Sequence, residues 1–162
     1  MILQKPTRSS RIIAQHERRR ATRAGEKHAK LEVRRRDKHC RVPGCGCRLR
    51  GLPLEVAHLH HKGAGGDPTL VRTMPEQMVL VCRQRHQDGV VSLHRGTLRC
   101  EPLTEQGCNG PVRWLVDLAA LYPDRFLMPR WTLLAEEKDC GLLLRPTVVE
   151  YEWIKDLAMM NR

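Results

Sequence analysis

Aromatic residues are scarce in this sequence, whose 162 residues include three Trp, two Tyr and one Phe, or 4% of the chain. We therefore expect an aliphatic core in which the few Trp and Phe side chains act as anchors. The chain has no run of about 18 apolar residues, so we expect no membrane-spanning helix. Its first residues, MILQKPTRSS, lack the apolar segment of a secretory signal. The length fits one domain, or a small domain with an added subdomain.

Acidic residues are few at the start of the chain. Residues 1–50 hold 16 Lys or Arg and four Asp or Glu, a net charge of +12, whereas residues 51–162 have a net charge of −1. The whole excess of +11 therefore belongs to the first 50 residues. Concentrated positive charge favours nucleic acid as the partner. The alternatives are an acidic protein, anionic lipid or a solvated basic tail.

The seven cysteines are an odd number and no secretion signal accompanies them, which favours metal binding over disulfides. Cys40, Cys45 and Cys47 lie close together in a loop rich in Gly and Pro, and Cys82 stands apart. Cys40 and Cys45 form a plausible first pair of zinc ligands, and Cys82 is expected to begin a second pair. We expect the other three to be small buried residues: Cys100, Cys108 and Cys140.

The fourth ligand of this expected zinc site is left open by the spacing. Arg85 occupies the position where a partner of Cys82 is expected, and a guanidinium does not bind a metal. The first candidates for the fourth ligand are Cys47 and His86, and His39 is a less favoured third candidate.

The pattern of apolar and turn residues predicts a mixed α+β chain. Residues 11–36 are expected to form a basic helix with a poor apolar face. A strand over 54–59 and a buried run over 78–81 follow, and then a short helix over 82–87 that ends at Gly89. Two further strands are expected to flank Arg95 and Gly96, and two packing helices to follow near the C-terminus. Their ranges are 90–94 and 97–102 for the strands, and 111–122 and 147–160 for the helices.

His58 is the first candidate for catalysis. It lies at the end of the expected strand over 54–59 and just before a glycine-rich loop, where an imidazole can project into a cleft. Because its pKa lies near neutrality, such an imidazole can take a proton from water. The alternative is that His58, like His60 and His61, is an ordinary surface residue.

The order of these segments resembles the HNH endonucleases of the zinc-knuckle type found in phages and bacteria. The resemblance covers about residues 36–102. It rests on five segments in sequence: RDKHCRVPGC over 36–45, EVAH over 55–58, Gly65-Gly66, QMVLVC over 77–82, and His86.

The resemblance implies a small ββα-metal (His-Me finger) core with a zinc knuckle. His58 matches the general base, Gln77 the middle Asn that pins the loop between the strands, and His86 the helical ligand of the catalytic metal. His94 lies near a later family histidine. The knuckle cysteines match Cys40, Cys45 and Cys82.

Three residues depart from the family pattern. Ala57 replaces the Asp or His that often precedes the base as a metal ligand, Gln77 is longer than Asn by one methylene, and Arg85 takes a zinc position. The divalent cation expected here is Mg2+, Mn2+, Ni2+ or Zn2+. Mg2+ prefers oxygen ligands. Because one carboxylate is missing and histidines are present, the softer ions Mn2+, Ni2+ and Zn2+ become plausible.

The resulting expectation is a metal-dependent DNA endonuclease that hydrolyses phosphodiester bonds in the cytoplasm of a bacterial or phage-infected cell. RNA is an alternative substrate, and a zinc-dependent nucleic-acid-binding protein with a decayed site is the alternative function. We divide the chain into a basic arm (1–36), an HNH domain (37–105) and a helical extension (106–162). Residues 111–162 are a candidate surface for a homodimer or another protein. The arginines expected to contact nucleic acid are Arg34, Arg35, Arg36, Arg41, Arg48 and Arg50.

Overall fold

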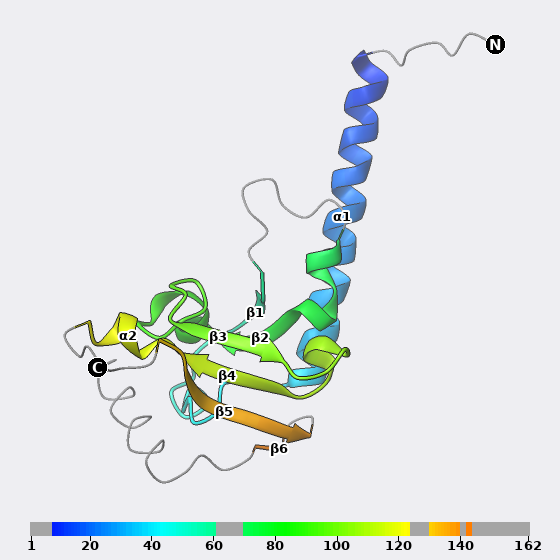
Figure 1. Cartoon of the computed structure of the whole chain (residues 1–162). Coiled ribbons are helices and arrows are strands. Elements are labelled where there is room, and N and C mark those ends of the chain that lie inside the picture. Colours follow the sequence, from blue (N-terminus) through cyan, green and yellow to red (C-terminus); the bar gives the residue numbers. More distant parts are fainter. Residues whose placement is uncertain (1–7, 61–69, 124–129, 140–141, 144–162) are drawn as a thin grey trace.

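A computed structural model describes residues 8–60, 70–123, 130–139 and 142–143 (Figure 1). They form a small α+β structure with an N-terminal helix, α1 (Arg8–Asp37), and two antiparallel sheets. The first sheet pairs β1 (Leu54–His58) with β2 (Met78–Cys82). The second has the strand order β3-β4-β5-β6. Its strands are β3 (Leu98–Pro102), β4 (Val112–Val116), β5 (Thr132–Asp139) and β6 (Leu142–Leu143).

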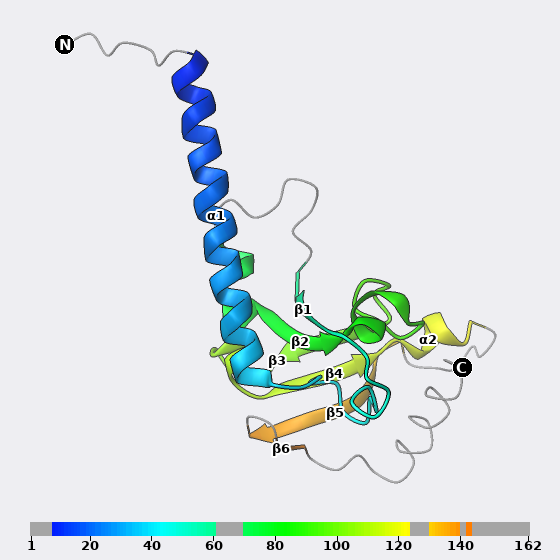
Figure 2. The same ribbon diagram turned by 180° about the vertical axis from the view of Figure 1, so that it is seen from behind.

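The predicted N-terminal helix is confirmed, and it packs on the body only through its C-terminal part. Ala29 and Val33 are buried against Met78 and Leu80 of β2. The N-terminal half stands clear of both sheets in the two opposite views (Figures 1 and 2). No helix in the described ranges combines the length and the apolar character that a membrane span requires.

The first sheet confirms the strand expected over 54–59 and the buried run over 78–81. All five residues of β2 are buried, because Met78 and Leu80 face α1 while Val79 and Val81 face the main core. Strand β2 leads into one turn of π-helix, η3 (Gln84–Asp88), at the site of the predicted short helix. Gly89 ends this turn because a Cβ there would lie 2.6 Å from the Gln84 carbonyl oxygen.

The hairpin predicted around Arg95 and Gly96 is wrong. Residues 90–94 form no strand, and β3 pairs with β4 instead. The Thr97 hydroxyl donates to the Val90 carbonyl at 2.6 Å and accepts from the Ser92 amide at 3.1 Å. Such side-chain bonds to the backbone compete with strand pairing and close this segment into a turn.

The helix predicted over 111–122 is also wrong. Strand β4 occupies 112–116, and only α2 (Leu118–Leu121) is helical, with the Asp117 carboxylate accepting from the Ala120 amide at 3.0 Å. In β4, Val112, Trp114 and Val116 are buried while Arg113 is exposed, which is the two-residue alternation of a strand. The helix predicted over 147–160 lies outside the described residues.

Three short 3-10 turns complete the described chain: η1 (Val71–Thr73), η2 (Pro75–Gln77) and η4 (Gly107–Asn109). The main core is formed by aliphatic residues, cysteines and the fully buried Trp114, which confirms the expected aliphatic core with a Trp anchor.

Candidate functional site

Four buried cysteines gather at one point. Cys40, Cys45 and Cys47 come from the loop after α1, and Cys82 comes from the end of β2. Their sulfur atoms all lie within 4.8 Å of one another, and the Cys45 and Cys82 sulfurs are 3.4 Å apart. In a tetrahedral site with Zn–S bonds of about 2.3 Å, the sulfurs lie ~3.8 Å apart. The four sulfurs are therefore close enough together to hold a structural Zn2+ ion.

The thiols of this cluster do not share one protonation state. Hydrogen bonds from Cys40 and Cys82 hold the pKa of Cys45 well below its usual range, and the nearby Arg85 lowers it further. Hydrogen bonds to Cys45 and Cys82 raise the pKa of Cys40. One thiolate is thus favoured at the expense of its neighbours. A bound cation would remove this competition, because metal binding requires every thiol to be deprotonated.

Cys47 is the fourth member of the cluster, among the candidates Cys47, His86 and His39. Arg85 cannot bind a metal, but its buried guanidinium lies beside Cys45 and donates to the Val91 carbonyl at 3.3 Å. A four-thiolate zinc site has a net charge of about −2, so Arg85 would act there as a buried counter-charge. Cys100 and Cys108 are buried outside the cluster, as expected, and Cys140 lies outside the described residues.

His58 lies at the end of β1, where its backbone pairs with Met78. Its side chain lines a cavity of about 490 Å3 together with His60, Leu93 and the ring of Trp131. Arg99 and Glu101 of β3 supply charges of opposite sign to the same cavity. His58 is half-buried at the wall of this cavity, and its Nε2 atom is shielded from solvent. The neighbouring residues 61–69, which include His61, Gly65 and Gly66, lie outside the described residues.

His86 lies on the turn after β2 and is only 9% exposed. Its Nδ1 atom lies 2.7 Å from Oε2 of Glu55, and its ring centroid lies 4.5 Å from that of His94 in an edge-on arrangement. An ionised carboxylate accepts hydrogen bonds and donates none, so Nδ1 carries the proton and the lone pair of the neutral imidazole is on Nε2. Carboxylates hold many metal-binding histidines in this way.

Glu55 is a residue that the sequence analysis missed. It lies two residues before Ala57 on β1, so the two side chains share one face of the strand. The period-two pattern of the strand predicts that Glu55 and Ala57 share a face, but nothing in the sequence indicates that His86 packs against this face.

The structure gives Gln77 a backbone role. The Gln77 carbonyl accepts from the Leu59 amide at 2.9 Å, which extends the β1–β2 ladder past His58. Ala57 is fully buried and contributes no ligand atom. In the described parts of the chain, no second group of three Cys, His, Asp or Glu ligand atoms gathers besides the cysteine cluster. His86 would therefore hold a divalent ion with few other protein ligands.

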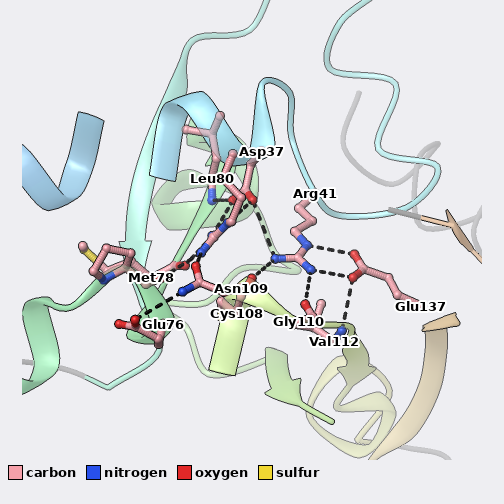
Figure 3. Close-up of polar contacts among 12 residues, drawn as sticks. Asp37, Arg41, Glu76, Met78, Leu80, Cys108, Asn109, Gly110, Val112 and Glu137 are labelled. Atoms are coloured by element: carbon pink, nitrogen blue, oxygen red, sulfur yellow. Dashed lines mark hydrogen bonds and ion pairs between the residues drawn. The ribbon is translucent and has the colours of Figure 1, made fainter. Parts of the chain in front are cut away.

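The six arginines expected to contact nucleic acid divide into two groups. Arg36 and Arg41 are engaged inside the protein. Arg36 pairs with Asp37 at 2.6 Å, and Arg41 pairs with Glu137 at 2.6 Å (Figure 3). Burial opposes the charge of Arg41, but the carboxylate of Glu137 outweighs it and raises the pKa of Arg41. This internal pairing counts against a phosphate contact for these two side chains. The exposed group consists of Arg34, Arg35, Arg48 and Arg50.

No family model, curated protein or solved structure matches the chain.

Proposed function

We propose that this chain is a metal-dependent DNA endonuclease of the HNH type. The observation that carries the proposal is the partly buried contact between His86, on the turn that follows β2, and Glu55 of β1, the strand that ends at His58. A strand bearing a base, an antiparallel partner and a helical turn bearing a metal ligand is the arrangement that the resemblance implies. The cysteine cluster beside them matches the expected zinc knuckle.

In this mechanism His58 takes a proton from water, which then attacks the phosphodiester. His86, oriented by Glu55, would be the residue that holds a divalent ion, and such an ion would supply charge stabilisation for the phosphodiester. The exposed Arg48 and Arg50 of the knuckle contact phosphate groups, which gives affinity with little sequence information.

The test is nicking of supercoiled plasmid by the zinc-loaded protein with added Mg2+, Mn2+ or Ni2+. His58→Ala is expected to lower the rate of nicking at least ~100-fold, in keeping with the loss of a general base. His28→Ala is the matched control, because His28 is an exposed histidine on α1 far along the chain from the site. Equal rates for the two variants would reject His58 as the base.

A second candidate function is zinc-dependent nucleic-acid binding without hydrolysis. It is favoured by Ala57, which is fully buried and leaves His86 without the second metal ligand that the family often has. This function predicts salt-sensitive binding of DNA with no nicking under any of the metals above. Nicking that disappears in His58→Ala excludes it.

A further inference from the structure

Helix α1 carries a row of cations on one side, which we call the basic stripe: Arg20, Arg23, Lys27, Lys30 and Arg34. The spacings of three and four residues place all five on one face, and the row is about 21 Å long at 1.5 Å per residue. We propose that the basic stripe is a docking surface for the phosphate backbone of double-stranded DNA. The inference deepens the proposed function and rests on it for the identity of the partner.

Three of the five cations of the stripe form no contact that holds the fold together within the described residues. Arg20, Arg23 and Lys27 are exposed and form no ion pair within the described part of the chain. Lys30 pairs with Glu26 at 2.7 Å, at the edge of a shallow groove that Arg23, Lys27 and Arg34 also line. Like charges three and four residues apart repel each other, so the row weakens the helix in the absence of an anion.

The position of the stripe points toward the candidate site. At its C-terminal end, Arg34 donates to the Leu54 carbonyl at 3.2 Å, and Leu54 begins the strand that ends at His58. The N-terminal half of α1 projects away from the body in both views (Figures 1 and 2). A strand of DNA lying along the stripe would therefore continue toward β1.

The chemistry of the helix favours duplex DNA over a membrane. A helix that binds a lipid surface needs a broad apolar face opposite its charges. On α1 the exposed large apolar residues are only Ile12, Ile13 and Leu31, and they form no continuous face. A straight, preformed row of cations also matches a duplex, whose phosphates are regularly spaced and whose backbone is stiff over ~150 base pairs.

The experiment compares two variants of the full-length, zinc-loaded protein that lose the same charge. Arg23→Gln/Lys27→Gln removes two cations of the stripe. Arg18→Gln/Arg113→Gln removes one cation on the opposite side of α1 and one on β4. Binding of a fluorescent 30-base-pair duplex is measured over a series of salt concentrations without added divalent ion, so that cleavage does not enter.

The stripe variant is expected to reduce the slope of log K against log salt by about 1.8, since each phosphate contact contributes about 0.9. The control is expected to keep the wild-type slope, and so is Arg23→Lys/Lys27→Arg, which preserves the charges. Equal slopes for the stripe and control variants would overturn the proposal. So would equal affinity for the single strand, or tighter binding to vesicles of anionic phospholipid.

The failure of this proposal can be told apart from that of the nuclease. If plasmid nicking persists and the stripe variant keeps the wild-type slope of log K against log salt, only the proposal for the basic stripe is rejected. If the slope of the stripe variant changes but the wild-type protein does not nick plasmid, the proposal for the basic stripe is supported and the proposal of DNA hydrolysis is rejected. A wild-type protein that does not bind duplex DNA overturns both.

Discussion

At the scale of the residue, a single hydrogen bond selects which nitrogen of His86 is available for chemistry. Glu55 accepts from Nδ1 at 2.7 Å, and the imidazole is nearly buried, so the ring has little freedom to turn. Nε2 is then the only ring nitrogen with a lone pair for a metal ion. In the proposed mechanism, Glu55 is a positioning residue that acts through His86.

Glu55→Gln tests this role. The amide can still accept from Nδ1, but it carries no charge that would make the ring a stronger metal ligand. The affinity for Mn2+ is therefore expected to fall roughly 10- to 100-fold, as it does when comparable partners of metal ligands are replaced. The measurement is the Mn2+ concentration that gives half-maximal nicking, with isothermal titration of Mn2+ as a second readout. Glu105→Gln, an exposed carboxylate, is the control. An unchanged metal dependence in Glu55→Gln would remove Glu55 from the site.

At the scale of the element, the loop over 38–51 has few apolar residues and depends on the cysteine cluster for its conformation. Gly44, Gly46 and Gly51 have φ values near 60°, which shows how sharply the loop turns to bring its three thiols to Cys82. Such a short loop buries little apolar surface, so a metal ion bound by the four thiols would add to the free energy that holds this shape.

Cys47→Ser is therefore expected to lower the zinc content from one ion per chain to a fraction of that, and to lower the melting temperature. The zinc content is measured by mass spectrometry of the purified protein. Cys100→Ser, another buried cysteine, and His86→Ala are expected to keep the metal. Loss of zinc in His86→Ala, with retention in Cys47→Ser, would assign the fourth ligand to the histidine.

At the scale of the whole molecule, a buried ionic network joins the two sheets. Asp37, at the end of α1, accepts from the Leu80 amide of β2 at 2.8 Å, and Arg41 continues the network to Glu137 of β5 (Figure 3). Oε2 of Glu137 also accepts from the Val112 amide of β4 at 3.1 Å. The guanidinium of Arg41 thus connects the loop after α1 to Glu137 of β5, a residue 96 positions away in the sequence.

Glu137→Gln is expected to destabilise the protein by about 3 kcal/mol, because it leaves the buried charge of Arg41 without its main partner. The free energy of unfolding is measured with urea. Glu136→Gln is the matched control, since Glu136 lies next to Glu137 on β5 and faces the other side of the strand. A difference of less than ~0.5 kcal/mol between the two variants would show that the network contributes little, as surface pairs do.

The elements that were predicted correctly are those whose cause is local. Helix α1, strand β1, the buried run of β2 and the turn that ends at Gly89 follow from hydrophobic periodicity and from a glycine position. The cysteine spacing was enough to predict a metal cluster. It left the fourth ligand open, because spacing along the chain does not say which side chains meet in space.

Other features depend on partners distant in the sequence and could not be predicted from local patterns. Val112 to Val116 forms a strand because β3 and β5 flank it, although its apolar residues also suit a helix. Arg36 and Arg41 look like surface cations in the sequence, and they turn inward because Asp37 and Glu137 meet them there. Local propensities differ by only ~1 kcal/mol per residue, so the burial of side chains and the pairing of charges override them.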